Sequence, residues 1–257
     1  MRVPLVAANW KMHGDSRFVS DYFTQLQNQL AAQSVQPSGK TLDIAVFPPF
    51  VYLQQALTAT GAAGISAVHI GAQNLSREPE GAFTGEVSAQ MLTDIGCRMV
   101  LVGHSERRSL YGESDALVAD KFVAAQHQGL IPVLCVGETL AQRESGDTLT
   151  VVGQQLDAVI ATAGLDNVAA AVIAYEPVWA IGTGKTATPE QAQDVHRAIR
   201  DLLGSAGQQT RILYGGSVKA ANAEDLFSQP DIDGGLVGGA SLDAEEFSVI
   251  CAKAMSN

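Results

Sequence analysis

Cysteine is scarce in this sequence, and no arrangement of cysteines suggests a disulfide framework. Cys97, Cys135 and Cys251 are odd in number and lie far apart along 257 residues. Disulfide-stabilised miniature domains and zinc knuckles need closely spaced sets of cysteines, so both classes are excluded. The His, Glu and Cys spacings offer no metal site either, and we expect no metal. This cysteine usage favours a reducing compartment, so a cytoplasmic location is expected.

Basic residues and long apolar runs are also lacking. The 27 Asp and Glu residues outnumber the 16 Lys and Arg residues, which gives a formal net charge of −11. An acidic surface repels nucleic acid and anionic membranes, so neither is expected as a partner. No apolar run approaches the ~18 residues of a membrane span, and the start MRVPLVAANWKM does not resemble a secretory signal. Against the general negative field, an anionic substrate would need a local positive centre.

Eight short apolar runs divide the chain at regular intervals. They cover residues 5–9, 42–47, 68–72, 99–103, 131–137, 171–175, 211–215 and 234–239. Segments with helical spacing lie between them, for example 189–204, where Thr188 is expected to cap the helix, Pro189 to begin it and Gly204 to follow its end. Alternating strands and helices imply parallel strands, and ~250 residues is typical of one eight-unit barrel. We predict an α/β fold, a closed (β/α)8 TIM barrel forming a single domain over residues 1–257, with an open doubly wound sheet as the alternative.

Reactive side chains follow several of the predicted strands. Asn9 and Lys11 follow the first strand, His104 and Glu106 the fourth, and Glu176 the sixth. Each residue taken alone would more often serve structure, but in a barrel the carboxyl ends of the strands face a common point. An amide, an ammonium, an imidazole and a carboxylate would therefore converge on one rim. The other histidines do not share this placement and are expected to be structural: His13, His69, His127 and His196.

Two glycine pairs follow the last two strands, in YGGS (residues 214–217) and GGAS (residues 238–241). The loops after strands seven and eight are the usual phosphate site of a barrel. Glycine allows backbone N–H groups to approach an anion closely, and a short helix after Gly239 would direct its positive end toward it. Either pair alone is weak as a signal, because tight turns also use glycine. Together they predict a phosphate monoester site that includes Ser217, Gly238 and Gly239.

The stretch AYEPVWAIGTGKT, residues 174–186, ends like a nucleotide-binding loop but lacks the first glycine of that motif. GTGKT looks like the end of a nucleotide-binding loop with the spacing G-x-x-x-x-G-K-[ST]. Counting back from Gly184, the first glycine should stand at position 179, where the residue is Trp179. The nucleotide-loop interpretation therefore fails on spacing.

These motifs, taken in order, resemble the triosephosphate isomerase family. The matching segments are NWKM (9–12), GAQN (71–74), GHSERR (103–108), CVGE (135–138), AYEPVWAIGTGK (174–185), YGGS and GGAS. They extend from about residue 4 to residue 245, and the AYEPVWAIGTG run is very specific. One departure is His13, where the family most often has Asn.

The resemblance implies interconversion of dihydroxyacetone phosphate and glyceraldehyde 3-phosphate, a step of glycolysis and gluconeogenesis, without a cofactor. Glu176 would be the base that moves a proton through an enediolate, and its carboxylate would be desolvated when a lid closes. His104 would polarise the carbonyl as a neutral imidazole, an arrangement for which this family is itself the reference case. Lys11 and Asn9 would stabilise the phosphate and the developing oxyanion. Glu106 would either shuttle protons or orient Lys11.

The resemblance also gives the GTGKT segment a role, since in this family it is part of a known gating lid. Residues 177–179 and 185–187 would be its hinges, Ala180 to Gly184 its small, mobile tip, and a backbone N–H near Gly182 would close onto the phosphate. The expected lid residues are Pro177, Val178, Trp179, Ala180, Ile181, Gly182, Thr183, Gly184 and Lys185. The polar connection 76–86 would insert into a partner subunit, with Thr84 near the partner's site, which implies a homodimer.

Two other functions stay open from the residues alone. An aldolase or lyase barrel would use a Schiff-base lysine inside a strand, whereas Lys11 lies just past a strand end. A non-catalytic phosphate-binding barrel would not need the complete set of Asn9, Lys11, His104 and Glu176. Borohydride trapping with substrate would distinguish the first of these from an isomerase.

Overall fold

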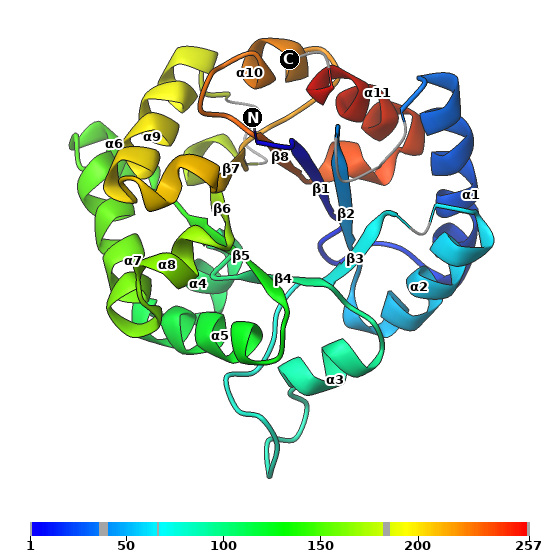
Figure 1. The fold of residues 1–257 in the computed structure, drawn as a ribbon, viewed down its shortest axis with the longest axis horizontal. Coiled ribbons are helices and arrows are strands. Elements are labelled where there is room, and N and C mark those ends of the chain that lie inside the picture. The colour runs from blue at the N-terminus through cyan, green and yellow to red at the C-terminus, as the bar shows by residue number, and fades with distance from the viewer. Residues whose placement is uncertain (1, 36–40, 66, 182–185, 256–257) are drawn as a thin grey trace.

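The computed structural model describes residues 2–35, 41–65, 67–181 and 186–255. Eight parallel strands pair in sequence order and close on themselves, β1 with β8 (Figure 1). The strands are β1 Leu5–Asn9, β2 Asp43–Phe47, β3 His69–Ala72, β4 Met99–Val102, β5 Ile131–Val136, β6 Val172–Tyr175, β7 Arg211–Tyr214 and β8 Gly234–Val237. The predicted closed barrel is confirmed, and closure excludes the open doubly wound sheet.

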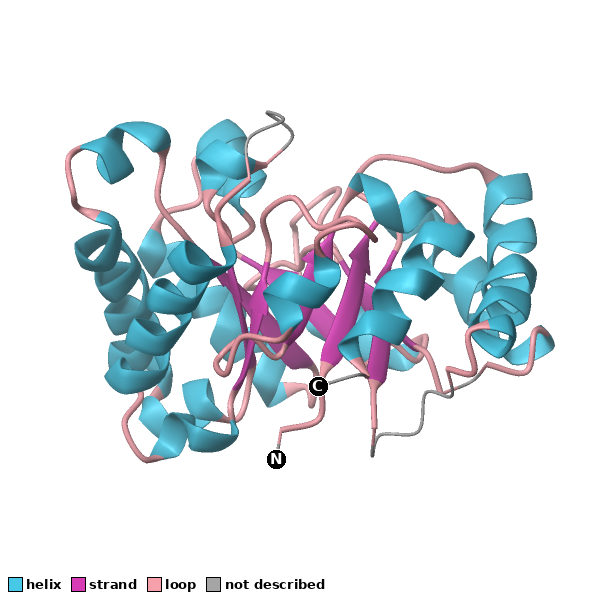
Figure 2. Ribbon diagram, turned by 90° about the horizontal axis from the view of Figure 1, so that it is seen from above, coloured by secondary structure: helices cyan, strands magenta, loops and turns pink. Residues whose placement is uncertain are grey.

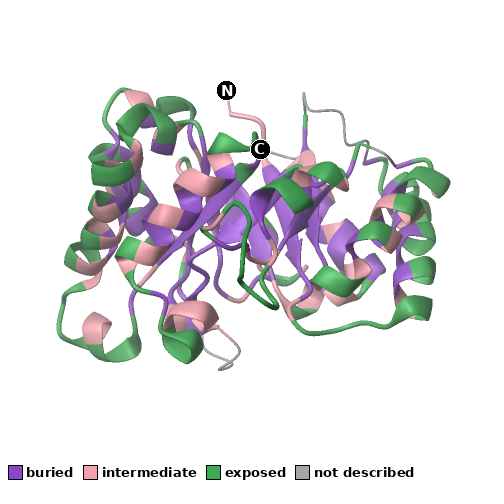
Figure 3. Cartoon of the chain, turned by 90° about the horizontal axis from the view of Figure 1, so that it is seen from below, coloured by how far each residue is buried: buried purple, intermediate pink, exposed green. Residues whose placement is uncertain are grey.

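Helices surround the strands on all sides (Figure 2). The α-helices are α1 Ser16–Ala32, α2 Leu53–Ala62, α3 Ala89–Asp94, α4 Ser105–Tyr111, α5 Asp115–His127, α6 Leu140–Glu144, α7 Thr148–Ala163, α8 Leu165–Ala169, α9 Pro189–Leu202, α10 Ala223–Phe227 and α11 Ala244–Ala254. Short 3₁₀ helices are η1 Phe50–Tyr52, η2 Val178–Ala180, η3 Ala206–Gln209 and η4 Gly239–Leu242. The helices bury one face against the strands and expose the other (Figure 3).

Period-two alternation along the strands explains which side chains enter the barrel. Leu5 and Ala7 of β1, and Val172 and Ala174 of β6, belong to the cluster inside the barrel, whereas Val6 and Ile173 pack in the outer layer between strands and helices. Successive strand residues face opposite sides, so the next inward positions after these pairs are 9 and 176. The strands therefore direct Asn9 and Glu176 toward the axis of the barrel.

The helix α9 shows how local sequence sets an element boundary. Thr188 accepts a hydrogen bond from the backbone N–H of Gln191, whose side chain accepts one from the backbone N–H of Thr188, and Pro189 occupies the first helical position. Gly204, with φ 57°, follows the end of the helix. This reciprocal cap satisfies N–H groups that the helix cannot pair internally. The predicted cap, start and end are confirmed.

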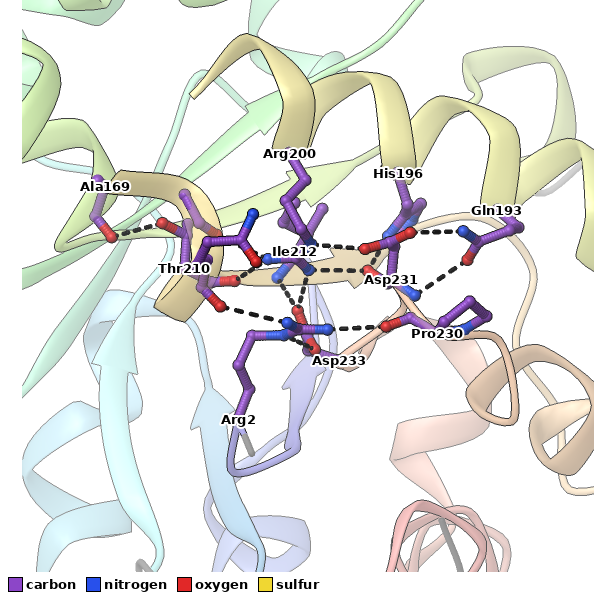
Figure 4. Close-up of polar contacts among 12 residues, drawn as sticks. Arg2, Ala169, Gln193, His196, Arg200, Thr210, Ile212, Pro230, Asp231 and Asp233 are labelled. Carbon is purple, nitrogen blue, oxygen red and sulfur yellow. Dashed lines mark hydrogen bonds and ion pairs between the residues drawn. The ribbon is translucent and has the colours of Figure 1, made fainter. Parts of the chain in front are cut away.

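A buried ionic network lies at the opposite end of the barrel from the carboxyl ends of the strands (Figure 4). The guanidinium of Arg200 donates to Asp231 Oδ1 at 2.7 Å and to Asp233 Oδ2 at 2.7 Å. It also donates to the carbonyls of Gly207 and Thr210. Arg2 donates to the other oxygen of Asp233 at 2.5 Å. These contacts join the start of β8 to α9 and to the residues before β1.

His196 of α9 is fully buried beside this network, between the rings of Tyr175 and Tyr214. Its Nδ1 lies 3.2 Å from the carbonyl oxygen of Asp231. Burial lowers the pKa of His196 from 6.5 to about 3. The folded state therefore resists protonation of this ring, whereas the unfolded chain accepts the proton below pH 6.5.

Stability should consequently fall as the pH drops below 6.5, because only the unfolded state gains a proton at position 196. A linkage slope of about 1.4 kcal/mol per pH unit predicts a loss of ~2 kcal/mol between pH 6.5 and 5.0 from this residue. Urea unfolding between pH 6.5 and 5.0 compares the wild type with His196→Asn, which retains a donor toward Asp231. The contribution of His196 is the change with pH in the difference between the two unfolding free energies. A difference in unfolding free energy that stays constant across this pH range contradicts the assignment.

Candidate active site

One pocket opens at the carboxyl ends of the strands and contains most of the predicted site residues. Asn9, Lys11, His104 and Glu176 line it. The turns after β7 and β8 complete the lining, with Gly215, Gly216, Ser217, Val218, Lys219, Gly238, Gly239 and Ala240. Ile181 and Leu236 add apolar surface. The structure thus brings together side chains that lie up to 231 positions apart in the sequence.

Glu176 and His104 meet directly in this pocket. Glu176 Oε1 lies 2.9 Å from His104 Nε2, and Glu176 Oε2 accepts a hydrogen bond of 2.8 Å from the backbone N–H of Ser105. The Glu176 side chain is only 2% exposed. Burial alone would raise the pKa of Glu176, but the His104 ring and the Ser105 N–H outweigh it, and the net pKa lies below its ordinary value.

The environment of Glu176 differs from the sequence-based expectation in one respect. We expected an exposed carboxylate that loses water only when a lid closes. The carboxylate is already buried, because period-two alternation directs it into the barrel and the N-terminus of α4 supplies it with a donor. Desolvation of Glu176 is therefore built into the barrel rim.

His104 is the N-cap of α4, and its Nδ1 accepts a hydrogen bond of 3.2 Å from the backbone N–H of Glu106. An Nδ1 that accepts must lack a proton, so the ring proton sits on Nε2 and points to Glu176. Burial lowers the pKa of His104, but the neighbouring carboxylates of Glu176 and Glu106 attract the charged form and the net pKa is raised. The hydrogen bond accepted by Nδ1 favours the neutral ring, whereas the Glu176 carboxylate favours the charged ring. The charge of His104 therefore depends on how near Glu176 lies.

Lys11 is held in a left-handed backbone conformation, with φ 51°. This conformation is uncommon for a residue with a side chain and often marks a functional position. The Lys11 backbone N–H donates to Asn9 Oδ1 at 3.0 Å, and Gln73 donates to the Lys11 carbonyl at 2.8 Å. Lys11 Nζ lies 2.5 Å from Glu106 Oε1, so Glu106 contacts Lys11 directly. Since Asn9 Oδ1 accepts from the backbone, its amide N–H₂ group is left to face the pocket.

The turn after β7 has no room for larger residues at its two glycines. A Cβ added at Gly215 would lie 2.8 Å from Cγ of Glu176, so the Glu176 side chain needs a glycine beside it. The predicted short helix is present as η4, a 3₁₀ helix that begins at Gly239 itself. Ser241 donates from both its N–H and its hydroxyl to the Gly238 carbonyl, and the hydroxyl of Tyr22 donates to the Ser241 carbonyl at 2.8 Å. These hydrogen bonds hold the backbone of the turn after β8 in place.

The expected lid is described only in part. Pro177 and Ile181 flank the 3₁₀ helix η2, in which Ala180 is fully buried. The Ala180 side chain thus packs inside rather than facing solvent, and the lid role expected of this segment stays a prediction. Gly182, Thr183, Gly184 and Lys185 lie outside the described residues.

Sequence reasoning assigned no role to Glu138, which binds side chains on both sides of Glu176. This fully buried carboxylate accepts hydrogen bonds from Trp179 Nε1 at 2.9 Å and from the Tyr175 hydroxyl at 3.1 Å. Arg143 lies 3.4 Å from it and stacks over the Trp179 ring. The signal was available, since Glu138 follows strand β5 as Glu176 follows β6.

The connection that contains Thr84 extends outward between β3 and α3, away from the barrel (Figure 1). Thr84 and its neighbours from Gly81 to Glu86 are exposed. Thr84 does not line the pocket of its own chain.

Neither a metal-binding cluster nor a membrane-spanning helix occurs among the described residues. No group of three or more His, Cys, Asp or Glu side chains in that part of the chain could hold a metal ion. Within the same residues, no helix combines the length and the apolar character that crossing a membrane requires.

Comparison with known proteins matches this geometry to a family. The family model described as Triosephosphate isomerase matches residues 4–254. The chain belongs to the triosephosphate isomerase family. A triosephosphate isomerase of Thiobacillus denitrificans is 58% identical over 258 residues, covering 99% of both chains. Those of Pseudomonas fluorescens and Pseudomonas aeruginosa are each 56% identical, over 259 and 261 residues, covering 99% and 100% of both chains.

Proposed function

We propose that this protein is a triosephosphate isomerase, which interconverts dihydroxyacetone phosphate and D-glyceraldehyde 3-phosphate through an enediolate. The contact between Glu176 and His104 carries the proposal, because it joins a buried carboxylate and an imidazole donor in a pocket that the glycine turns after β7 and β8 also line. A carboxylate base and a neutral hydrogen-bond donor are what proton transfer next to a carbonyl requires. The family membership of the whole chain supports the same reaction.

In the proposed mechanism, Glu176 removes a proton from the carbon next to the carbonyl, and the electron pair moves to the carbonyl oxygen. His104 Nε2–H and the Asn9 amide donate hydrogen bonds to that oxygen, and Lys11 supplies positive charge. A proton then passes from the hydroxyl oxygen of the enediolate to the oxygen that took up the negative charge. Glu176 finally returns its proton to the carbon that carried the carbonyl, while the other oxygen forms the new carbonyl, so the isomerisation uses no oxidant, reductant or cofactor. Glu106 acts by orienting Lys11 through its ion pair.

The pKa of His104 follows the position of Glu176 in this scheme. The Glu176 carboxylate raises the pKa of His104 in the free protein, against the effect of burial. When Glu176 turns toward the substrate carbon, that attraction weakens and burial favours the neutral ring. Substrate binding thereby prepares His104 as a neutral donor.

The phosphate is proposed to bind across the glycine turns. Backbone N–H groups at Ser217, Gly238 and Gly239 would donate to its oxygens, with Lys11 as the counter-charge. Gly182 would add a further N–H when the lid closes, which would exclude water from the enediolate. The Lys11 Nζ is engaged by the Glu106 carboxylate rather than free to attack a carbonyl, which argues against the Schiff-base alternative.

A coupled assay with glyceraldehyde 3-phosphate, run with and without chelator, tests the proposal. We expect rapid formation of dihydroxyacetone phosphate at the same rate in both conditions, because no step uses a metal or cofactor. Absence of turnover, or turnover that is lost with chelator, would reject it.

A mimic of the enediolate should bind more tightly than the substrate. The site is proposed to complement the planar, charged intermediate rather than the ground state, and analogues of that kind gain affinity accordingly. We expect 2-phosphoglycolate to bind at least about tenfold more tightly than dihydroxyacetone phosphate. Calorimetry gives the dissociation constant of 2-phosphoglycolate, which is compared with the KM of the substrate. Equal or weaker binding of the mimic counts against an enediolate-stabilising site.

A homodimer is proposed as the working form. Met12, Leu110 and Tyr111 are exposed and line one hollow together with Lys11, and Phe83 is exposed in the 76–86 connection. Exposed apolar side chains gathered on one side of a molecule favour association. Insertion of the 76–86 connection into a partner would cover them and bring Thr84 near the partner's pocket. Sedimentation at several protein concentrations tests this, and a monomer throughout would reject it.

The protein is further proposed to act in the cytoplasm. Its three cysteines are unpaired and buried, as suits a reducing compartment, and its acidic composition disfavours nucleic acids and membranes as partners.

A further inference from the structure

Two lysines of the described residues line the pocket, and they differ in their surroundings. Lys11 is part-buried and paired with Glu106. Lys219 lies across the pocket, two residues after Ser217, and is exposed while still lining it. Its ammonium has no ion-pair partner within 4.0 Å among the described residues. The rim of the phosphate side therefore carries a solvated, uncompensated positive charge.

The backbone beneath Lys219 is fixed. Asn222 Oδ1 accepts from the Lys219 N–H at 2.8 Å, and Asn222 Nδ2 donates to the Ser217 carbonyl at 3.0 Å. The backbone N–H groups of Asn222 and Ala223 also bond to the Lys219 carbonyl. One amide side chain thus ties the Lys219 backbone to the Ser217 peptide, so the Lys219 side chain extends from a point held beside the predicted phosphate turn.

We propose that Lys219 recruits the substrate: its ammonium attracts the phosphate dianion to the pocket mouth and does not take part in the proton transfers. The inference rests on the proposed function. An incoming dianion meets a protein of formal net charge −11, so the potential at the mouth depends on the few cations nearby. At physiological salt, exposed charges act over roughly 8 Å. Lys219 lines the same pocket as the turns proposed to bind the phosphate, so its ammonium adds positive potential there, and its exposure limits its effect on the buried Glu176–His104 pair.

The test compares steady-state kinetics of the full-length wild type, Lys219→Gln, Lys219→Glu and Lys219→Arg between low and high ionic strength. Arg17→Gln is the matched control, because it removes one exposed positive charge on α1, away from the pocket. At low salt we expect Lys219→Gln to lower kcat/KM by roughly threefold to tenfold and Lys219→Glu by more, with kcat within about twofold of wild type. The differences should shrink in high salt, and Lys219→Arg and Arg17→Gln should behave as the wild type does.

Inhibition by inorganic phosphate gives a second readout, and Lys219→Gln should weaken it in the same proportion. The inference is overturned if Lys219→Gln keeps the wild-type kcat/KM and salt dependence, or if it lowers kcat and Lys219→Arg does not restore it. Failure of the proposed function would appear differently, as a wild type without isomerase activity.

Discussion

Replacing Glu176 with glutamine is expected to lower kcat by about a thousandfold or more, with KM little changed and the fold intact. Glutamine preserves the size of the side chain and can still accept the Ser105 N–H, but it cannot take a proton from carbon. General-base catalysis by a placed side chain contributes typically 10²–10⁴-fold, and here the base is removed altogether. The coupled assay gives kcat, and circular dichroism with thermal unfolding shows whether the barrel is retained.

Glu144→Gln on α6 is the matched control, because it makes the same chemical change at an exposed glutamate outside the pocket. This control should keep the wild-type kcat. A Glu176→Gln protein that retains near-full turnover would mean that another group accepts the proton, and the assignment of the base would be wrong.

Replacing Arg200 with alanine is expected to lower the free energy of unfolding by about 3–5 kcal/mol. The change removes the donor to both Asp231 and Asp233 and leaves two backbone carbonyls without their partner in a buried site. Removing one member of a buried ion pair is costly because the remaining charge has lost its solvent and its counter-ion. Urea unfolding at one fixed protein concentration measures the loss.

The same experiment has an internal comparison on the same helix. Arg197 forms an exposed pair with Asp194, and Arg197→Ala should change the unfolding free energy by no more than about 0.5 kcal/mol. Because the Arg200 network lies at the other end of the barrel from the pocket, folded Arg200→Ala protein should keep a near wild-type kcat. Equal stability losses in the two variants would show that the network does not stabilise the barrel in the way inferred.

Much of the fold was predictable because burial on both sides leaves an unambiguous pattern. All eight apolar runs became strands, and their ends differ from the predicted ones by at most two residues. Parallel strands covered by helices need apolar side chains on both faces. Each apolar run therefore ends close to where the strand ends and the chain leaves the sheet. The cap at Thr188 was equally readable, since it depends on residues three positions apart.

Contacts between distant residues were not predictable from the pattern. The ion pair between Arg2 and Asp233 joins residues 231 positions apart, and no local spacing indicates it. The hydrogen bond from the Ser105 N–H to Glu176 depends on how closely β4 and β6 approach at the rim, which composition does not encode. The burial of Ala180 was missed for a related reason, because a small residue in a glycine-rich stretch looks like a loop tip whether or not other side chains cover it.

The central claim is that Glu176 moves a proton through an enediolate in this pocket, and isomerisation in D₂O tests it most directly. A proton held on the carboxyl group of Glu176 exchanges with solvent, so glyceraldehyde 3-phosphate formed from dihydroxyacetone phosphate should carry deuterium at C2 when followed by NMR. In Glu176→Gln, deuterium incorporation should fall together with turnover. A wild-type product free of solvent deuterium, or incorporation that continues at the wild-type rate in Glu176→Gln, would contradict the account.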